Sequence, residues 1–295
     1  MSAGVSRRAS SWAALALTFN AFTWGVSWWP FRELHARGLH PLWATAITYA
    51  AAAVVLAIAR PAALREVARH PGLWMLVLAS GCTNAAFNWG VTVGDVVRVV
   101  LLFYLMPLWA LLLARIVLHE PLGALAIARV ALALAGALVV LWPDGGGWPM
   151  PHTLADWLGV AGGFSFALNN VMLRHQAHRS EIARGVAMFG GGAAVAALLA
   201  LTLVSAPPEA QASAWAPGVA VLALWFMASN LALQYGAARL RASTTAVVMV
   251  SEVLFASASA IALGAGVLTP RVAIGGALIL LAALLAARGD RPRAT

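Results

Sequence analysis

Long apolar runs, separated by short clusters of arginine, proline and glycine, dominate the pattern of this chain. A helix needs about 20 apolar residues to cross ~30 Å of hydrocarbon. On that measure the pattern predicts ten membrane-spanning helices, near residues 12–30, 41–59, 71–93, 96–117, 122–142, 156–174, 184–204, 216–235, 243–264 and 270–287. Such lengths leave no room for a sizeable soluble domain. The expected fold class is therefore an all-α polytopic membrane protein.

The arginine positions predict how these helices are oriented. If the N-terminus is cytoplasmic, fifteen of the nineteen arginines fall on the inner side. The four toward the outer side are Arg32, Arg37, Arg98 and Arg271. Basic residues are enriched in the cytoplasmic loops of membrane proteins, so the split predicts that both termini lie inside. It also accounts for a net charge of +9, which in a soluble protein would suggest nucleic acid as a partner.

The chain divides into two halves, 1–146 and 147–295, at a turn-rich connection. Each half holds five predicted spans, and because five is odd, the second half must enter the membrane in the opposite orientation. An offset of 146 positions aligns polar and aromatic residues of the two halves: Asn84 with Asn230, Asn88 with Gln234, and Trp89 with Tyr235. Inverted repeats place a substrate site near the midplane and allow alternating access. We expect that architecture here.

The amino-acid composition excludes several classes of fold and of chemistry. Hydrophobic residues make up 62% of the chain and charged residues 10%, against roughly 25% charged in a soluble domain, so a soluble fold is excluded. The chain has no lysine, which excludes a retinal or pyridoxal Schiff base. Cys82 is the only cysteine, so no intrachain disulfide forms. The histidines lie near span ends, which predicts neither a metal site nor a cofactor.

Polar residues within the spans are the informative ones, because burying a polar group in hydrocarbon without a partner costs several kcal/mol. They recur at helical spacing on three spans: Asn20, Trp24 and Trp28; Asn84 and Asn88; Asn230 and Gln234. Each set shares one helix face. Two interpretations stay open. The amides either hold neighbouring helices together, or they line a pocket that binds a polar ligand while aromatic rings stack on its apolar part.

Charged residues and a proline add further candidates. Glu252 falls near the middle of the ninth span, as a structural carboxyl, a proton-coupling group or a counter-charge for a substrate amine. Asp95 and Arg98 are spaced to form an ion pair at the start of the fourth span, either structural or at the external mouth. Pro107 should bend that span, and Tyr104, one turn earlier, should share the opening.

An enzymatic function has little support. A serine protease within the membrane needs a histidine beside its nucleophile. No histidine falls within the spans that hold the candidate serines Ser80, Ser165, Ser251 and Ser257. Glycine pairs such as Gly162 and Gly163 are expected to let helices pack closely.

Three segments resemble the drug/metabolite transporter superfamily, in its EamA-type branch: "FTWGVSWWPFR", "LLFYLMPLWALLLARIVLHEPL" and "VVMVSEVLFASASAIAL". Trp24, Gly25, Pro107 and Glu120 match residues usual in that family, and Glu252 matches its glutamate in the ninth span. The proline that usually follows this glutamate is replaced by Val253, and Gly266 stands where the repeat offset would place a second glutamate.

The resemblance implies a cavity lined by spans one, three, four, six, eight and nine. Within the superfamily the chain is most similar to exporters of aromatic amino acids. The expected function is therefore a secondary transporter, without enzymatic activity, that exports amino acids across a bacterial inner membrane. The alternative is a carrier of organic cations, drugs or other metabolites. Besides its substrate and the bilayer no partner is expected, and the chain is expected to act as a monomer.

The candidate substrate-binding residues combine the polar positions with the family resemblance: Trp24, Asn84, Asn88, Tyr104, Asn230, Gln234 and Glu252, with Asn20, Trp28 and Asn169 as secondary candidates. The candidate gating or ion-pair residues are Asp95, Arg98 and Pro107.

Overall fold

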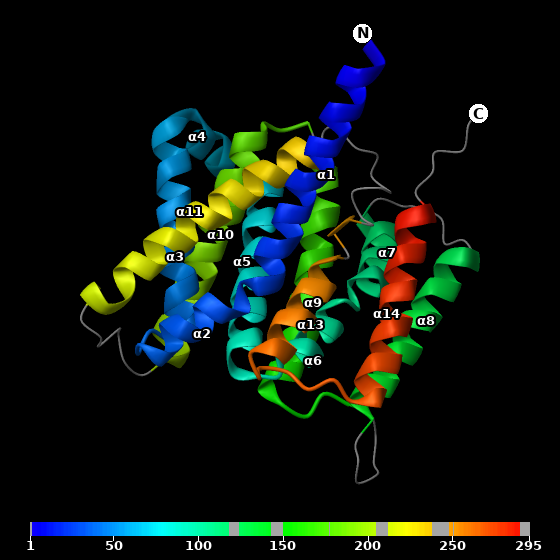
Figure 1. The fold of residues 1–295 in the computed structure, drawn as a ribbon. Coiled ribbons are helices and arrows are strands. Elements are labelled where there is room, and N and C mark those ends of the chain that lie inside the picture. Colours follow the sequence, from blue (N-terminus) through cyan, green and yellow to red (C-terminus); the bar gives the residue numbers. More distant parts are fainter. Residues whose placement is uncertain are drawn as a thin grey trace.

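The structure is a computed structural model that describes residues 2–117, 124–142, 150–176, 178–204, 212–237, 248–249 and 251–289. These residues form a bundle of helices joined by short connections, and they include no strand (Figure 1). The helices are α1 (Ser2–Val26), α2 (Trp28–Ala36), α3 (Pro41–Ala59), α4 (Pro61–Arg69), α5 (Pro71–Val93), α6 (Val96–Phe103), α7 (Met106–Val117), α8 (Ala124–Leu141), α9 (Leu154–His175), α10 (Glu181–Leu203), α11 (Ala212–Ala237), α13 (Ser251–Ala262) and α14 (Pro270–Gly289).

The predicted all-α fold is confirmed, and each predicted span overlaps a helix of the structure. Within the described residues, four helical segments are long and apolar enough to cross a membrane: 41–59, 96–117, 181–203 and 212–233. Shorter apolar helices cover 130–141, 251–262 and 270–282. The arrangement as ten spans in two inverted repeats stays a prediction.

Two predicted spans are interrupted in the structure. The first ends as α1 at Val26, and after Ser27 the chain continues as α2. The fourth is divided into α6 and α7 by a turn at Tyr104 and Leu105. The second break lies just before Pro107, whose missing N–H group and fixed φ suit the first turn of a helix.

Helix α4 was not predicted from the apolar runs because it is too short and too polar to span a membrane. It follows Pro61, and Ala63 and Val67 on one face are buried, while Arg65 and Arg69 are exposed. A short amphipathic helix with arginines on its polar face is typical of the membrane–water interface. Here α4 connects α3 to α5 at one end of the bundle (Figure 1).

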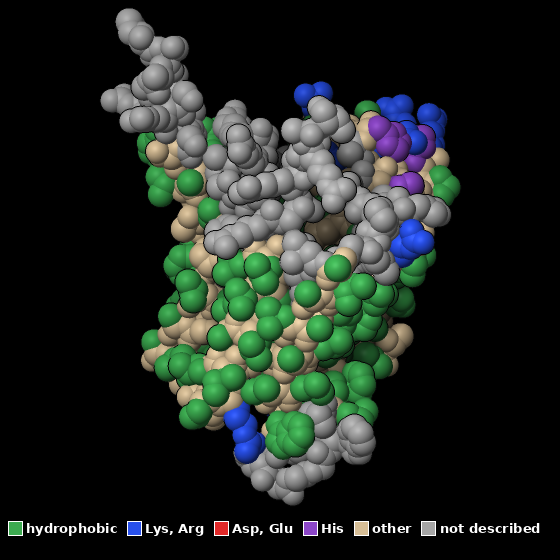
Figure 2. Space-filling view, turned by 90° about the vertical axis from the view of Figure 1, so that its right-hand side faces the viewer, with side chains coloured by type: hydrophobic (Ala, Val, Ile, Leu, Met, Phe, Trp, Pro, Cys, Tyr) green, Lys and Arg blue, Asp and Glu red, His purple; other side chains and the backbone are tan. Residues whose placement is uncertain are grey.

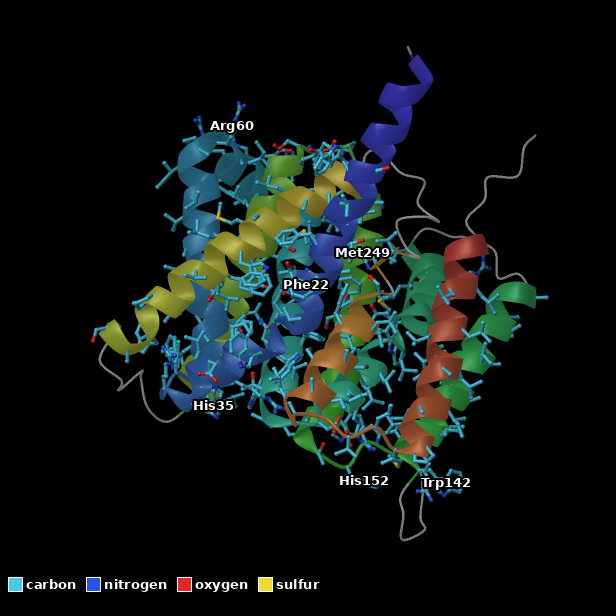
Figure 3. All side chains as sticks on the ribbon, in the orientation of Figure 1. Phe22, His35, Arg60, Trp142, His152 and Met249 are labelled. Carbon is cyan, nitrogen blue, oxygen red and sulfur yellow. The ribbon has the colours of Figure 1, made fainter. Side chains whose placement is uncertain are left out.

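The arginines divide between the two ends of the bundle. Figure 3 shows Arg60 at one end and His35, His152 and Trp142 at the other, and we call these the Arg60 end and the His152 end. Helix α1 begins and α14 ends at the Arg60 end (Figure 1). In Figure 2 most of the visible basic and histidine side chains gather at that end, and apolar side chains cover the middle. The cytoplasmic location of the Arg60 end stays a prediction.

The helices pack in reciprocal pairs. Helix α5 packs against α9 and α10, and α6 also packs against α9. On the other side of the bundle, α1 packs against α11 and α13. Helices α3 and α10 pair at one edge of the bundle, and α8 and α14 pair at the other (Figure 1). We call α1, α2, α11 and α13 the first group of helices, and α5, α6, α9 and α10 the second group. The two groups meet where α2 packs against α5 and where α6 packs against α13.

Glycines set how closely several helices approach. A Cβ atom on Gly136 of α8 would lie 2.6 Å from the carbonyl oxygen of Gly275 in α14, and one on Gly275 would lie equally close to the Gly136 carbonyl. Glycine at both positions therefore allows backbone-to-backbone contact, as small residues do between membrane helices. In α9, Gly162 and Gly163 likewise pack against Phe103, so the close packing expected of this pair is found.

Candidate functional site

A small cavity lies between α1, α3, α5, α10 and α11, and it collects polar and aromatic side chains from both halves of the chain. Its lining consists of Trp24, Tyr49, Ser80, Asn84, Met188, Phe189, Phe226 and Asn230. Three of these, Trp24, Asn84 and Asn230, are candidates from the sequence. The structure therefore brings together the two asparagines that the 146-residue offset aligns.

Asn84 is the centre of a hydrogen-bonded cluster on one wall of the cavity. The hydroxyl of Tyr49 donates to Asn84 Oδ1 at 2.5 Å. Asn84 Nδ2 donates to the carbonyl oxygen of Ser80 at 2.8 Å and lies 3.2 Å from its Oγ. Ser80 Oγ in turn lies 3.2 Å from the carbonyl oxygen of Met188 on α10. The cluster joins α3, α5 and α10 with neutral groups only.

Aromatic rings form the opposite wall. Phe226 of α11 lies 4.9 Å from Trp24 and 5.8 Å from Tyr49, measured between ring centroids. Phe189 of α10 lies 5.6 Å from Tyr49. Trp24 also meets Phe87 of α5 edge to face at 6.4 Å. The aromatic wall is thus continuous across both groups of helices, and it could stack on the apolar part of a ligand.

The cavity has a volume of about 40 Å³. That is room for about one water molecule, whose share of liquid volume is ~30 Å³. Pockets that hold small organic ligands measure about 300–1,000 Å³. The helices must therefore separate before the cavity admits a metabolite.

The other predicted amides hold helices together. Asn20 Nδ2 donates to Ser229 Oγ at 2.7 Å and to its carbonyl oxygen at 2.9 Å, so it joins α1 to α11. Asn88 is fully buried and donates to Thr45 Oγ1 at 3.1 Å. Neither lines the cavity. For Asn20 and Asn88 the interhelical interpretation fits the structure better than the pocket interpretation.

The remaining secondary candidates also lie away from the cavity lining. Trp28 Nε1 donates to Ser259 Oγ at 2.9 Å, which joins α2 to α13. Asn169 of α9 is buried, and its Oδ1 atom has no hydrogen-bond partner in the described part of the chain. The side chain of Gln234, and all of Glu120, lie outside the described residues.

Tyr104 and Glu252 form a second polar contact. Tyr104 Oη lies 3.3 Å from Glu252 Oε2 and 3.4 Å from the carbonyl oxygen of Met249. Tyr104 comes from the break between α6 and α7, and Glu252 from the first turn of α13, so the contact crosses between the two groups of helices. Neither residue lines the cavity. The ten candidates therefore do not share one site.

The predicted ion pair between Asp95 and Arg98 does not form. Asp95 is the N-cap of α6, and its Oδ1 accepts from the backbone N–H of Arg98 at 2.8 Å. The Arg98 guanidinium turns instead to Asp156 of α9, with Nε 2.6 Å from Oδ1 and Nη2 3.1 Å from Oδ2. The Asp95 carboxylate is used to cap the first turn of α6, where backbone N–H groups need an acceptor. The Arg98 guanidinium therefore forms its bidentate pair with Asp156.

Asp156 was missed because it lies at the edge of a predicted span, where a carboxylate is ordinary. Its side chain is only 2% exposed. Besides Arg98, it accepts from the backbone N–H groups of His152 and Thr153 at 3.0 and 3.3 Å. An open hollow of about 460 Å³ at the His152 end is lined by this cluster, including Asp95, Arg98 and Asp156. Within the described residues, no group of three histidine, cysteine or acidic side chains could hold a metal ion.

Comparison with known proteins shows which family and which structures this chain is similar to. Residues 11–142 match the EamA-like transporter family. Fourteen chains of solved structures match as well. One of them, described as "Crystal structure of protein", superposes with a TM-score of 0.57 at 20% sequence identity, over 96% of this chain and 98% of that one, which shows a shared fold. No curated protein matches the sequence.

The family is one of transporters and not of enzymes. Together with the apolar helices, the match indicates a multi-pass membrane protein, and residues 11–142 are similar to transporters of the drug/metabolite superfamily. It covers residues 11–142, less than half of the chain, and these include Trp24, Asn84 and Tyr104 among the candidate residues. The substrate and the mechanism of transport stay predictions.

Proposed function

We propose that this protein is a secondary transporter that exports amino acids, aromatic and other small neutral ones, across a bacterial inner membrane by alternating access. The observation that carries the proposal is the cavity in which Asn84 and Asn230, from the two halves, meet an aromatic wall. Amide and hydroxyl groups can bind the ammonium and carboxylate of a zwitterion, while Trp24 and Phe226 can stack on its side chain.

In this proposal the candidate residues divide by role. Trp24, Asn84 and Asn230 contact the substrate. Tyr49 and Phe226, which were not among the candidates from the sequence, contact it as well. Asn20, Asn88 and Trp28 position the helices through the hydrogen bonds to Ser229, Thr45 and Ser259. The two halves, 1–146 and 147–295, act as inverted repeats, and the helices around the cavity separate to enlarge it.

Asn84 and Asn88 provide a matched pair for the test. Both are buried asparagines on α5, one helical turn apart, but only Asn84 lines the cavity. A ligand that binds the folded protein raises its apparent melting temperature. We expect Asn84→Ala to raise at least tenfold the concentration of phenylalanine or tryptophan that gives half of the maximal shift. Asn88→Ala should leave this concentration unchanged.

Uptake into proteoliposomes should follow the same order, with Asn230→Ala reducing transport as Asn84→Ala does. The proposal is wrong if Asn84→Ala and Asn230→Ala together leave transport of every amino acid unchanged in a protein that remains folded.

A carrier of organic cations is the second candidate, and Glu252 favours it. Within the described residues no basic side chain forms an ion pair with this carboxyl group, whose neighbour is the Tyr104 hydroxyl. A carboxylate without a cationic partner could bind a substrate cation. Under this alternative Glu252→Gln abolishes transport of a quaternary ammonium probe, whereas under the amino-acid proposal the same variant still binds phenylalanine.

A further inference from the structure

Arg32 links two groups of helices at the His152 end. It belongs to α2, which continues α1, and its guanidinium reaches the last turn of α5. Nε donates to the carbonyl oxygen of Val91 at 3.1 Å, and Nη2 donates to that of Gly94. The last carbonyls of a helix have no partner within the helix, and a cation near them is favoured by the helix dipole. Arg32 therefore bonds to carbonyl oxygens at the C-terminal end of α5 that have no partner within that helix.

The side chain of Arg32 is held in this position from its own helix. Its guanidinium carbon lies 5.3 Å from the ring centroid of Trp28, one turn earlier on α2. Trp28 is itself fixed by its hydrogen bond to Ser259 of α13. A series of contacts thus crosses the bundle from one group of helices to the other: it begins at α13, continues through Trp28 and Arg32, and ends at α5.

Asp95 makes a second link at the same end. Its Oδ2 accepts from the backbone N–H of Val267 at 2.8 Å, in the connection between α13 and α14. Next to it, the backbone N–H of Val96 donates to the carbonyl oxygen of Ala265 at 3.2 Å. These bonds join the start of α6 to the end of α13. Because Asp95 lines the open hollow at the His152 end, water can replace its bond to Val267 when the groups separate.

Arg98 and Asp156 do not cross between the groups. They join α6 to α9, and Arg98 Nη1 also donates to the carbonyl oxygen of Val140 at the end of α8, at 2.9 Å. This pair therefore stiffens one side of the contact, while Arg32 and Asp95 bridge it. The bridging residues lie at the end opposite Arg60, where His35 of α2 and His152 are found (Figure 3).

We propose that Arg32 and Asp95 form the gate that closes the cavity from the outside, and that transport requires these bonds to break. The inference rests on the proposed carrier function. It adds which contacts separate: the guanidinium of Arg32 leaves the end of α5, and the Asp95 carboxylate releases the connection after α13. A carrier that alternates between two packings needs such a weak, polar and reversible contact at each end.

The gate can be tested without a substrate. In a Cys82→Ser background, Ser80→Cys places one thiol in the cavity lining. A membrane-impermeant maleimide is then added to intact cells, so that it reaches this thiol only through an open external gate. Arg32→Gln and Asp95→Ala should each raise the labelling rate roughly three- to tenfold, since losing charge-assisted hydrogen bonds shifts a two-state equilibrium by that order.

Arg37→Gln is the matched control. It lies on the turn after α2, close to Arg32. Its exposed side chain pairs with Glu33 at 3.8 Å on its own helix and donates to the carbonyl oxygen of Ala214 on α11 at 3.4 Å, so its described bonds stay within the first group of helices. Labelling in this variant should equal that of the parent. Arg32→Lys, which retains the charge but not the forked geometry, should give an intermediate rate.

The gate is wrong if Arg32→Gln and Asp95→Ala leave external labelling unchanged in protein that elutes as a folded species, or if Arg37→Gln raises it equally. Labelling of inside-out vesicles gives the complementary measurement: if the gate holds the external side closed, opening it should reduce access from the cytoplasmic side. A protein that does not transport amino acids could still show these changes, so failure of the proposed substrate and failure of the gate are distinguishable.

Discussion

Polar groups join neighbouring helices both at the cavity and at the His152 end, but the two regions use different kinds of group. In the cavity the cluster of Tyr49, Ser80 and Asn84 uses hydroxyl and amide groups. At the His152 end Arg98 and Asp156 use full charges. A charge near the middle of a bilayer is costly, whereas one near its surface can keep partial contact with water. The difference suggests that charges secure the end of the bundle while neutral groups meet the ligand.

Glu252 is the exception to this division. It lies within the apolar helix α13, and its described polar neighbour is the Tyr104 hydroxyl at 3.3 Å. A carboxyl group in that setting is a functional candidate in its own right. The contact with Tyr104 also spans the break between α6 and α7, so it is placed to sense a movement of either helix.

Removing the charge of Asp156 should have the largest effect on stability. Asp156→Asn leaves the guanidinium of Arg98 and two backbone N–H groups without a carboxylate, and losing one partner of a buried ion pair costs about 3 kcal/mol. Thermal unfolding in detergent, followed by tryptophan fluorescence, should show a large fall in melting temperature. The exposed pair of Glu33 and Arg37 is the comparison, and Glu33→Gln should change stability by less than about 0.5 kcal/mol. Equal effects at both sites would remove the distinction between the two regions.

The neutral cluster should show a smaller but coupled effect. Tyr49→Phe removes only the hydroxyl that donates to Asn84 Oδ1, and leaving a buried acceptor without its donor costs about 1–2 kcal/mol. Because Asn84→Ala removes the same bond from the other side, the double variant should lose less than the sum of the two. Unfolding of the four proteins in one detergent gives this coupling energy. Strict additivity would show that the two residues act independently.

The smallest expected effect is a dependence on pH at the His152 end. His40 is the N-cap of α3, and its Nδ1 accepts from the backbone N–H of Leu42 at 3.2 Å. Burial lowers the pKa of His40 below its ordinary value of 6.5, and the nearby His35 lowers it further. The neutral form is therefore the stabilising one: its contribution is complete above pH ~6.5 and is lost as the pH falls through the lower pKa of the folded state.

His40→Asn keeps an acceptor at the N-cap but does not titrate. The loss of stability between pH 7 and pH 5 should thus be smaller in this variant, by at most about 1 kcal/mol, the usual contribution of a cap. Melting temperatures across that range provide the measurement. None of the residues that line the cavity is a histidine, so parallel pH profiles for the two proteins would place the pH dependence at some other group.

Much of the fold could be predicted because it depends on local properties. The length of an apolar run determines whether a helix can span a bilayer, and the positions of arginine indicate which ends lie together. The four arginines predicted toward the outer side, Arg32, Arg37, Arg98 and Arg271, do lie at the end opposite Arg60. Helix α4 escaped prediction because it lies at a surface, where hydropathy gives little signal.

The candidate site was predicted only in part. Helical spacing placed Asn84 and Asn88 on one helix face, but spacing does not indicate which neighbouring helix each side chain meets. Tyr49 and Phe226 were missed for the same reason, since an aromatic residue in a span is as common in a core as in a pocket.

The sequence by itself determined that this is a helical membrane protein with polar groups that require partners, because the cost of burying a polar group depends on the residue and its depth in the membrane. The tertiary structure alone decided the choice of partners. It joined Asn84 to Tyr49, turned Arg98 from Asp95 to Asp156, and brought Arg32 to the end of α5. Those choices depend on how distant segments pack, and packing is a property of the whole bundle.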